Sequence, residues 1–319
     1  MQRLGRLILL VALFCVPAPA QAHDIKGAML ERVSGIAQAH AAALAATPTA
    51  DASTRSVLYN LFLWPVPRKL TICFWSGNAQ VRKRFTASMR KMWPLAELTD
   101  RRLEFEQTTF DNPPTCAAQP QQDLRVDFKS GDGHWSWPGV ISLQHARSMN
   151  LQGFTENMPP QAMFDRLVAH ETGHALGLGH EHQSAQAPAC GWNFNYIRAN
   201  YQWESEQQMM AQFERFVDYI YNDKHAYIFS NYDKRSIMHY AFPRGAFRNG
   251  TADPCFIVEN EKPSDQDKNA LRVAYGPNLI AQQAQTRSAI PEMLTRFADA
   301  QYEPLRKVMQ FKFDLLANQ

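Results

Sequence analysis

Four of the chain's ten histidines lie between His170 and His182, in the stretch VAHETGHALGLGHEHQ (168–183). His170 and His174 are four residues apart on a predicted helix, so both imidazoles project from one face and can bind the same metal ion. Glu171 is offset from them, so that its carboxylate can reach a ligand of that metal without binding the metal itself. The spacing therefore predicts a metal site with a carboxylate beside it.

The third histidine of the pattern follows two glycines. A helix that continued to His180 would carry it almost three turns past His170, about 15 Å along the axis and out of range of the metal. Gly177 and Gly179 can end the helix, because glycine readily adopts the positive φ that terminates one. We therefore expect the chain to turn and to return His180 to the metal. Three neutral imidazoles leave one coordination position for water, which is typical of a catalytic zinc site and not of a closed structural site.

Such a site suits the hydrolysis of a peptide bond. Zinc lowers the pKa of a bound water to about 7, and Glu171 can accept the proton of this water and later return it to the leaving amine. The metal can also polarise the scissile carbonyl and stabilise the tetrahedral oxyanion. We expect one catalytic Zn²⁺ ion as the cofactor.

The motifs of the chain resemble those of a known family of zinc enzymes. HETGHALGLGH (170–180) resembles the HExxHxxGxxH motif of the metzincin zinc endopeptidases. SIMHY (236–240) resembles the Met-turn of the astacin family, and LFLWP (61–65) is similar to the start of an astacin catalytic domain. The resemblance covers about residues 60–277. It implies a zinc metalloendopeptidase with three zinc ligands, His170, His174 and His180.

The resemblance also implies roles for other side chains near the metal. Glu171 would be the catalytic base, and Met238 would form the hydrophobic floor beneath the metal. Tyr240 would be an additional zinc ligand in the resting enzyme and would move away to stabilise the oxyanion, since a phenol can act both as an oxygen ligand and as a hydrogen-bond donor. Glu181 stands where the family has a glutamate that can pair with the mature N-terminus once a pro-segment is removed.

The fold that the resemblance implies is an α+β, metzincin-like catalytic domain of two subdomains. A twisted, mostly parallel sheet with two long helices would lie above the zinc cleft, and an irregular half would lie below it. The residues agree with this arrangement. Asn78 caps a predicted helix, Pro159-Pro160 opens the helix of the histidine motif, and residues 181–277 show little regularity. Apolar and β-branched runs predict strands at 70–75, 102–108, 124–128 and 139–143.

The stretch DGHWSWPGVISL (132–143) precedes the histidine helix, where such enzymes keep an edge strand that faces the substrate. A protein or peptide substrate bound as an extended strand could add to this edge through main-chain hydrogen bonds. Trp135 and Trp137 are candidates for lining the substrate groove. The alternative is that they pack within the fold, as aromatic residues before a strand more often do.

The N-terminus has the pattern of a secretory signal. Two arginines precede the apolar run LILLVALFCV (7–16), and small residues follow it. This pattern predicts cleavage after Ala22 and a secreted or periplasmic protein. The bulky Phe14 disfavours a lipid anchor at Cys15, because a lipoprotein signal needs a small residue there.

Composition divides the chain into four segments. Residues 23–55 are rich in alanine and show helical spacing, so they form either a surface helix or a removable pro-segment. Residues after Pro277 show a further helical pattern. The expected segments are a signal peptide (1–22), an Ala-rich helical segment and candidate pro-segment (23–55), a zinc metallopeptidase catalytic domain (56–277) and a helical C-terminal extension (278–319).

Four cysteines remain once the signal peptide is removed. An even number of cysteines in an exported chain favours disulfide bonds, here with three alternative pairings. We prefer the pairing in which each bond stays within one half of the chain. The proposed bonds are Cys73–Cys116 and Cys190–Cys255.

Charge and hydropathy argue against two classes of partner. The formal net charge is +3, and the longest basic run is RKR (82–84), so a nucleic acid is not expected. No apolar run approaches the roughly 20 residues that span a bilayer, so stable membrane insertion is not expected either. The sequence does not determine the oligomeric state.

Two alternatives to the metzincin interpretation are considered. A thermolysin-like site would take its third ligand from a later helix, where Glu204 or Glu206 is available, but His180 already has a suitable spacing. The second alternative is an exported binding or adhesion protein that retains zinc only for structure. Glu171 argues against it, because a structural site has no use for a carboxylate that does not bind the metal.

Overall fold

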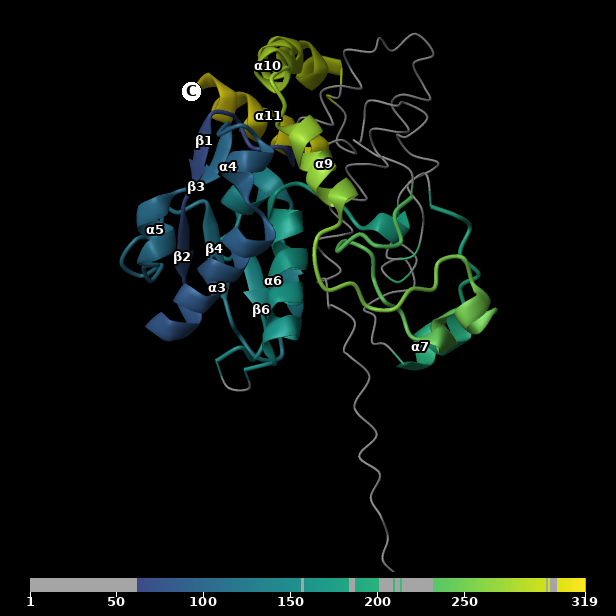
Figure 1. Cartoon of the computed structure of the whole chain (residues 1–319). Helices are drawn as coiled ribbons and strands as arrows, with labels where there is room; N and C mark the ends of the chain where they lie inside the picture. Colours follow the sequence, from purple (N-terminus) through teal and green to yellow (C-terminus); the bar gives the residue numbers. More distant parts are fainter. Residues whose placement is uncertain are drawn as a thin grey trace, which may run out of the picture.

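The computed structural model describes residues 62–155, 158–183, 187–200, 232–296 and 303–318, together with Met209, Phe213 and Ala298 (Figure 1). The expected signal peptide, the Ala-rich segment 23–55 and the alternative ligands Glu204 and Glu206 lie outside the described residues. No helix within the described ranges is long and apolar enough to cross a membrane.

The central sheet has four short strands in the order β2–β4–β6–β5. β2 (Ile72–Phe74), β4 (Leu124–Asp127) and β6 (Met149–Leu151) run parallel, and β5 (His134–Ser136) pairs antiparallel with β6. β1 and β3 form a separate parallel pair. Their bounds are Arg68–Leu70 and Leu103–Phe105. The expected α+β class with a mostly parallel sheet is therefore confirmed.

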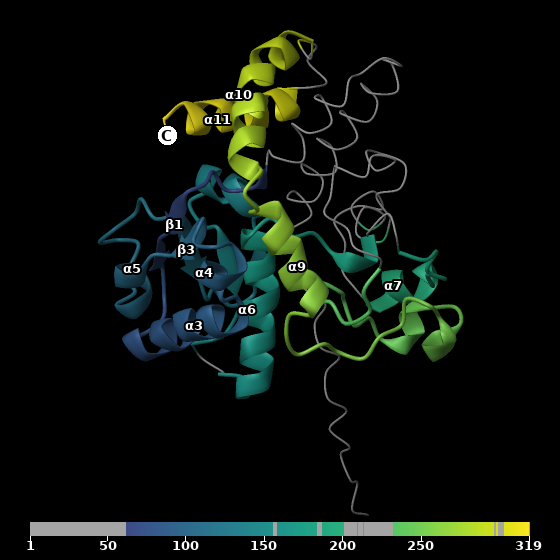
Figure 2. The ribbon, with the colours of Figure 1, turned by 45° about the horizontal axis from the view of Figure 1, so that its top comes forward.

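Two long helices lie side by side against one face of this sheet (Figure 1, Figure 2). They are α3 (Ala79–Met92) and α6 (Gln161–Ala175). Phe85 of α3 contacts Phe74 of β2 and Phe164 of α6, with ring centroids 5.4 and 6.5 Å away. All three rings are fully buried, and burial of each stabilises the fold by about 1.5–3 kcal/mol. This core fixes α6, the helix of the histidine motif, on the sheet.

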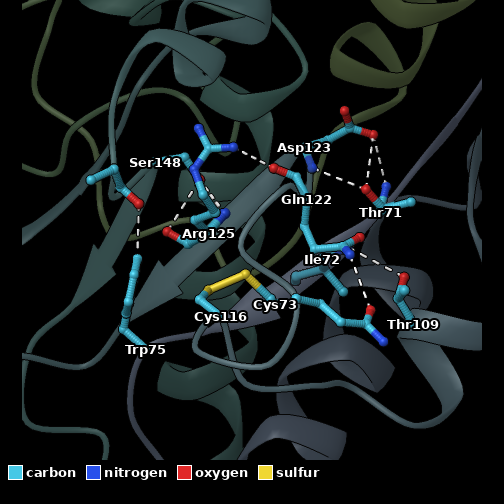
Figure 3. The surroundings of a disulfide bond; sticks show 12 residues. Thr71, Ile72, Cys73, Trp75, Thr109, Cys116, Gln122, Asp123, Arg125 and Ser148 are labelled. Carbon is cyan, nitrogen blue, oxygen red and sulfur yellow. Dashed lines mark hydrogen bonds between the residues drawn. A yellow bond between two sulfur atoms is a disulfide. The ribbon is translucent and has the colours of Figure 1, made fainter.

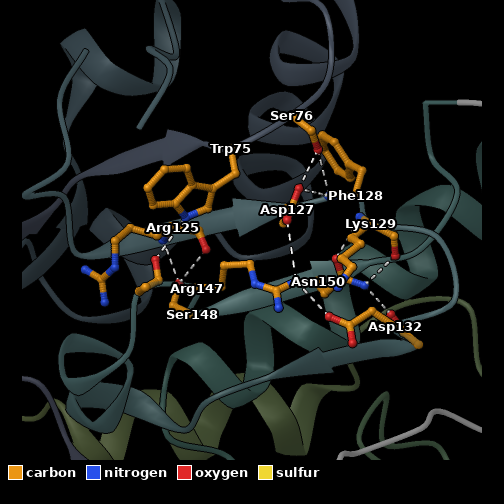
Figure 4. A network of polar contacts seen from close by, with 12 residues as sticks. Trp75, Ser76, Arg125, Asp127, Phe128, Lys129, Asp132, Arg147, Ser148 and Asn150 are labelled. Atoms are coloured by element: carbon orange, nitrogen blue, oxygen red, sulfur yellow. Dashed lines mark hydrogen bonds and ion pairs between the residues drawn. The ribbon is translucent and has the colours of Figure 1, made fainter. Parts of the chain in front are cut away.

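The opposite face of the sheet carries polar and aromatic side chains (Figure 4). Arg147 forms ion pairs with Asp132 at 2.7 Å and with Asp127 at 3.5 Å. Its guanidinium also lies 5.9 Å from the ring of Trp135 on β5. Arg147 therefore links the edge strand β5, through Trp135, to β4, through Asp127.

Both predicted disulfide bonds are present. Cys73 of β2 is bonded to Cys116 in the loop after α5 (Gln107–Asp111), as Figure 3 shows. Cys190 is bonded to Cys255 in the second half of the chain. Each bond lies within one half of the chain, as expected.

The described elements of the second half are short and surround a smaller core. Trp192 lies at its centre, with ring centroids 5.1 Å from Phe242 and 5.0 Å from Phe247. The described elements of this half are η2 (Glu181–Gln183), α7 (Phe194–Asn200), η4 (Arg244–Ala246) and η5 (Gly250–Ala252). Where the structure describes it, this half has the irregular character that the sequence predicts.

Three helices end the chain. α9 (Asp265–Ala274) returns to the main core, and α10 (Leu279–Arg296) and α11 (Glu303–Ala317) follow and contact each other. Leu279 belongs to the main core, and Phe311 packs against it. The helical C-terminal segment therefore packs on the rest of the molecule and does not stand apart from it.

The helix start at Asn78 is confirmed, because its side chain accepts the N–H of Val81 at 2.9 Å. The strand at 124–128 is confirmed as β4, whereas the strand at 70–75 is interrupted between β1 and β2. The run at 102–108 forms β3 and then the start of α5, with the short α4 (Leu95–Leu98) before it.

The strand expected at 139–143 is wrong. These residues form the 3-10 helix η1 (Gly139–Gln144). The run is buried along most of its length, and a short apolar run of this kind has no periodicity that separates a strand from a buried helix. The turn begins at Pro138, whose carbonyl accepts the N–H of Ile141 at 3.1 Å.

Candidate active site

The three histidines of the motif come together. His170 and His174 project from one face of α6 with ring centroids 4.9 Å apart, and His180 lies 4.6 Å from His174 and 5.5 Å from His170. One nitrogen atom of each ring lies within 4.8 Å of the others, and all three residues are buried. Across the described ranges, no other group of three His, Cys, Asp or Glu residues is arranged to share a metal ion.

A turn at Gly177, called here the glycine corner, brings His180 back toward the other two histidines. Gly177 has a φ of 96°, which residues with a side chain rarely adopt. The N–H of Leu178 donates to Gly173 O at 2.9 Å, and the N–H of Gly177 donates to His174 O at 2.7 Å. This pair of bonds is the Schellman motif that ends many helices. The expected contribution of Gly179 is wrong, because its φ is not positive; Gly177 makes the corner.

Each of the three imidazoles has its Nδ1 beside an oxygen that accepts a hydrogen bond. The contacts are His170 Nδ1 with Ile237 O at 2.8 Å, His174 Nδ1 with Leu178 O at 2.8 Å, and His180 Nδ1 with Gln183 Oε1 at 3.1 Å. A carbonyl or amide oxygen only accepts, so the proton of each neutral imidazole lies on Nδ1. Each Nε2 then offers a lone pair, as in histidines that bind metals.

The facing nitrogens fit a zinc ion. His174 Nε2 lies 3.0 Å from His180 Nε2. Two unprotonated nitrogens at this distance repel each other, and a cation between them removes the repulsion. Tetrahedral zinc with bonds of about 2.0–2.1 Å would hold two nitrogens roughly 3.3 Å apart. Burial, and then the neighbouring histidines, lower the pKa of His180, which keeps its imidazole in the neutral form that binds metal.

Glu171 lies on α6 directly after the first histidine, and its side chain is buried, with 1% exposure. Burial raises its pKa to about 7, against the opposing effect of His174. A carboxyl group with this pKa can accept and return a proton at neutral pH, which is what general base and acid catalysis requires. Its role as the general base stays a prediction.

The turn at residues 236–240 packs directly against the histidine helix. A Cβ atom at Gly173 would overlap Met238 Sδ and lie 3.2 Å from Met238 Cε, so the side chain of Met238 occupies the space that a larger residue at position 173 would fill. The preceding carbonyl, Ile237 O, is the oxygen beside His170 Nδ1. The turn therefore supports α6 and orients one of its histidines.

α9 holds this turn through Asp267, a residue to which the sequence analysis gave no role. The hydroxyl of Ser236 donates to Asp267 Oδ1 at 2.6 Å, and the N–H of Ile237 donates to Oδ2 at 2.8 Å. The same carboxylate closes a capping box with Ser264 at the start of α9. The spacing Ser264-x-x-Asp267 signals a helix start, but nothing in the sequence shows that the carboxylate also reaches position 236.

Tyr240 lies beside the histidines, as expected. Its ring centroid is 4.2 Å from that of His180 and 5.4 Å from that of His170. The ring of His182 is fully buried, and it lies 5.2 Å from that of Tyr240 and 5.4 Å from that of His180. His182 has no role predicted from the sequence, and here it packs against both of these rings.

Glu181 is held by the segment before the Met-turn. Its Oε1 accepts the N–H of Asp233 at 2.8 Å, and its own N–H donates to Met238 O at 3.1 Å. Burial, opposed by the bond from Asp233, raises its pKa to about 7. The residues that would supply a mature N-terminus lie outside the described ranges, so this pairing stays a prediction.

The two tryptophans proposed for the substrate groove make contacts within the fold. Trp135 is buried, with Arg147 near its ring. Trp137 is half-buried and stacks on His145, with centroids 3.6 Å apart and ring planes at 4°. These contacts account for their packing, and a role in substrate binding stays a prediction.

Comparisons with known proteins agree with this site. Residues 121–274 match the family model described as Astacin (Peptidase family M12A). The matched range includes α6, the glycine corner, the Met-turn and most of α9. Among curated proteins, no match was found.

Solved structures also resemble the chain. The structure of myroilysin has 24% sequence identity, covers 68% of this chain and 97% of that chain, and gives a TM-score of 0.52. High choriolytic enzyme 1, a hatching enzyme zinc-protease from Oryzias latipes (Medaka fish), has 16% identity, covers 67% of this chain and 94% of that chain, and gives a TM-score of 0.40. The first of these shows the same fold.

The family match supports a zinc-dependent metalloendopeptidase, and it contains the three histidines that can bind the metal. Over residues 121–274, the chain therefore carries a match to the astacin family, peptidase family M12A.

Proposed function

We propose that the protein is an exported zinc endopeptidase in which three histidines hold the metal and Glu171 is the general base. The observation that carries the proposal is that three buried histidines each bring one ring nitrogen within 4.8 Å of the others, and that the buried carboxyl group of Glu171 follows the first of them on α6. Each imidazole is oriented by an acceptor at its Nδ1. The proposed zinc ligands are His170, His174 and His180.

When bound, zinc would acidify a water molecule and polarise the scissile carbonyl group. Glu171 would accept the proton of that water and return it to the leaving amine, and its pKa of about 7 supports both transfers. The Tyr240 hydroxyl would donate a hydrogen bond to the negative charge that develops on the carbonyl oxygen. Met238 would keep α6, and thus two histidines, in place from below.

The substrate would be a protein or peptide bound as an extended strand. β5 supports this proposal, because among the described strands it pairs on one side with β6 and has no strand on its other side. Main-chain groups of a substrate could pair with such an edge. Trp135, the middle residue of β5, and Trp137, directly after β5, would then line the substrate groove.

The N-terminal pattern supports export with cleavage after Ala22. Two disulfide bonds agree with an oxidising compartment. We assign residues 1–22 to the signal peptide, 23–55 to a candidate pro-segment, 56–277 to the catalytic domain and 278–319 to a C-terminal extension.

Cleavage of casein by the purified, zinc-loaded protein tests the proposed function. The matched variant is Glu171→Gln, which keeps the size of the side chain and removes its basicity. We expect wild type to cleave, a chelator to abolish cleavage, and the variant to bind zinc with activity reduced on the order of 10²–10⁴-fold. If wild type and variant both bind zinc and are equally inert, the alternative of an exported binding or adhesion protein with a structural zinc replaces the enzyme.

A further inference from the structure

The two C-terminal helices, which cross in Figure 2, bury two polar side chains that the proposed reaction does not use. Lys312 of α11 is fully buried, and its Nζ donates to Leu63 O at 2.6 Å. Gln283 of α10 is also buried; its Nε2 donates to Trp64 O at 2.9 Å, and its Oε1 accepts the N–H of Val66 at 3.3 Å. Lysine is almost never fully buried without a partner, so the fold keeps this side chain for the contact that it makes.

The segment that these side chains hold lies against the C-terminal end of α6. Trp64 Nε1 donates to Ala175 O at 2.7 Å, and the hydroxyl of Tyr275 donates to Leu176 O at 2.8 Å. The N–H of Trp64 in turn donates to the hydroxyl of Tyr275 at 3.3 Å. The last carbonyls of a helix have no partner within the helix, so residues 63–66 and Tyr275 complete the end of α6.

The same segment contacts the glycine corner. A Cβ atom at Gly177 would lie 3.2 Å from Leu63 Cδ2 and 3.8 Å from Phe62 O. Gly177 has the positive φ that returns the chain toward His180. A continuous set of contacts therefore leads from the C-terminal helices, through residues 62–66, to the corner that sets the position of the third histidine.

We propose that Lys312 and Gln283 are positioning residues for His180. They hold residues 63–66 against the end of α6, and so keep the corner in the shape that places His180 Nε2 3.0 Å from His174 Nε2. This gives the segment 278–319 a function at the active site, although it lies outside the range that matches the Astacin family model. The inference rests on the proposed zinc site.

The test variant is Lys312→Met, which keeps most of the length of the side chain and removes its hydrogen-bond donor. Two readouts are measured: the zinc dissociation constant, by competition with a chromophoric chelator, and the absorption spectrum of the cobalt-substituted protein, which reports coordination geometry. We expect zinc binding to weaken on the order of tenfold, the lower end of the range for residues that orient metal ligands, and the cobalt spectrum to change. If Lys312→Met does not fold, Gln283→Leu is measured in its place by the same two readouts, and the same changes are expected.

Phe85→Leu is the matched control for general destabilisation. Phe85 packs against Phe164, which precedes Gly177 by thirteen residues, about 20 Å along a helix. This control should lower the melting temperature and leave the zinc constant and the cobalt spectrum unchanged.

A double variant tests whether Lys312 acts on the zinc site through residues 63–66. Trp64→Phe removes the donor to Ala175 O, so it should weaken zinc binding by itself. If Lys312 acts through residues 63–66, Trp64→Phe and Lys312→Met combined should weaken zinc binding by less than the product of the two single effects.

Two results overturn the inference alone: a Lys312→Met protein with the zinc constant and cobalt spectrum of wild type, or effects that multiply fully with those of Trp64→Phe. A wild-type protein that binds no zinc refutes the proposed function, and this inference falls with it.

Discussion

Replacing Gly173 by alanine tests the direct support of the histidine helix by the Met-turn. In an open helix position, alanine is favoured over glycine by about 1 kcal/mol. Here the added Cβ would overlap Met238 Sδ and lie 3.2 Å from Met238 Cε and 3.5 Å from Trp93 Cζ2. Both neighbours are buried, and overpacking of a core typically costs about 1–3 kcal/mol. The cost less the gain leaves a net loss, so we expect Gly173→Ala to lower the free energy of unfolding by up to about 2 kcal/mol.

The same change should have the opposite sign once Met238 is truncated. In a Met238→Ala background the Sδ atom is gone, so Gly173→Ala should raise the free energy of unfolding by up to about 1 kcal/mol. Urea denaturation of wild type, both single variants and the double variant measures the coupling energy, which we expect to equal the overpacking cost of about 1–3 kcal/mol. Measurement in the presence of a chelator separates this packing effect from zinc binding.

A stabilising effect of Gly173→Ala in the wild-type background would refute this reasoning. A coupling energy below about 0.5 kcal/mol, the usual limit of additivity for independent sites, would refute it as well. Either result would mean that Met238 does not occupy the space beside position 173.

Three further predictions concern residues around the site. Asp267→Ala leaves the buried donors of Ser236 and Ile237 without their acceptor, so unfolding measured in urea should become easier by about 2–4 kcal/mol; an effect under about 1 kcal/mol would contradict the assigned contacts. Tyr240→Phe removes the proposed donor to the oxyanion, and steady-state kinetics should show kcat lower on the order of 10²-fold with little change in KM; an unchanged kcat would exclude that role. Burial lowers the pKa of Lys312 to about 7, whereas the pKa of a lysine in the unfolded chain is about 10.4. Between these two pKa values the unfolded chain binds more protons than the folded chain. The stability of wild type relative to Lys312→Met should therefore rise with pH by up to about 1.4 kcal/mol per pH unit in this range and be constant below pH 7. Urea denaturation at several pH values measures this difference in stability, and a difference that is constant from pH 7 to 10 would contradict the prediction.

The parts of the site that the sequence predicts correctly depend on local spacing. A separation of four residues places His170 and His174 on one face of any α-helix. Gly177 ends that helix because of its own φ, and Asn78 begins α3 through its own side chain. Such features need no knowledge of distant parts of the chain.

The parts that the sequence does not predict depend on contacts between distant residues. Asp267 reaches Ser236 across thirty-one positions, and Lys312 reaches Leu63 across 249. The periodicity of apolar residues along the sequence does not reveal contacts between residues so far apart. The incorrect strand at 139–143 has a related cause, since burial on several sides removes the alternation that separates a strand from a helix.

X-ray diffraction from crystals of the protein, with data collected on both sides of the zinc absorption edge, tests the central claim most directly. The account predicts one anomalous peak, bonded to the Nε2 atoms of His170, His174 and His180 at about 2.0–2.1 Å, with a solvent molecule or Tyr240 at the remaining position. A peak bonded to only two of these histidines would contradict it. A metal ion with four protein ligands, none of them Tyr240, and no solvent molecule would also contradict it.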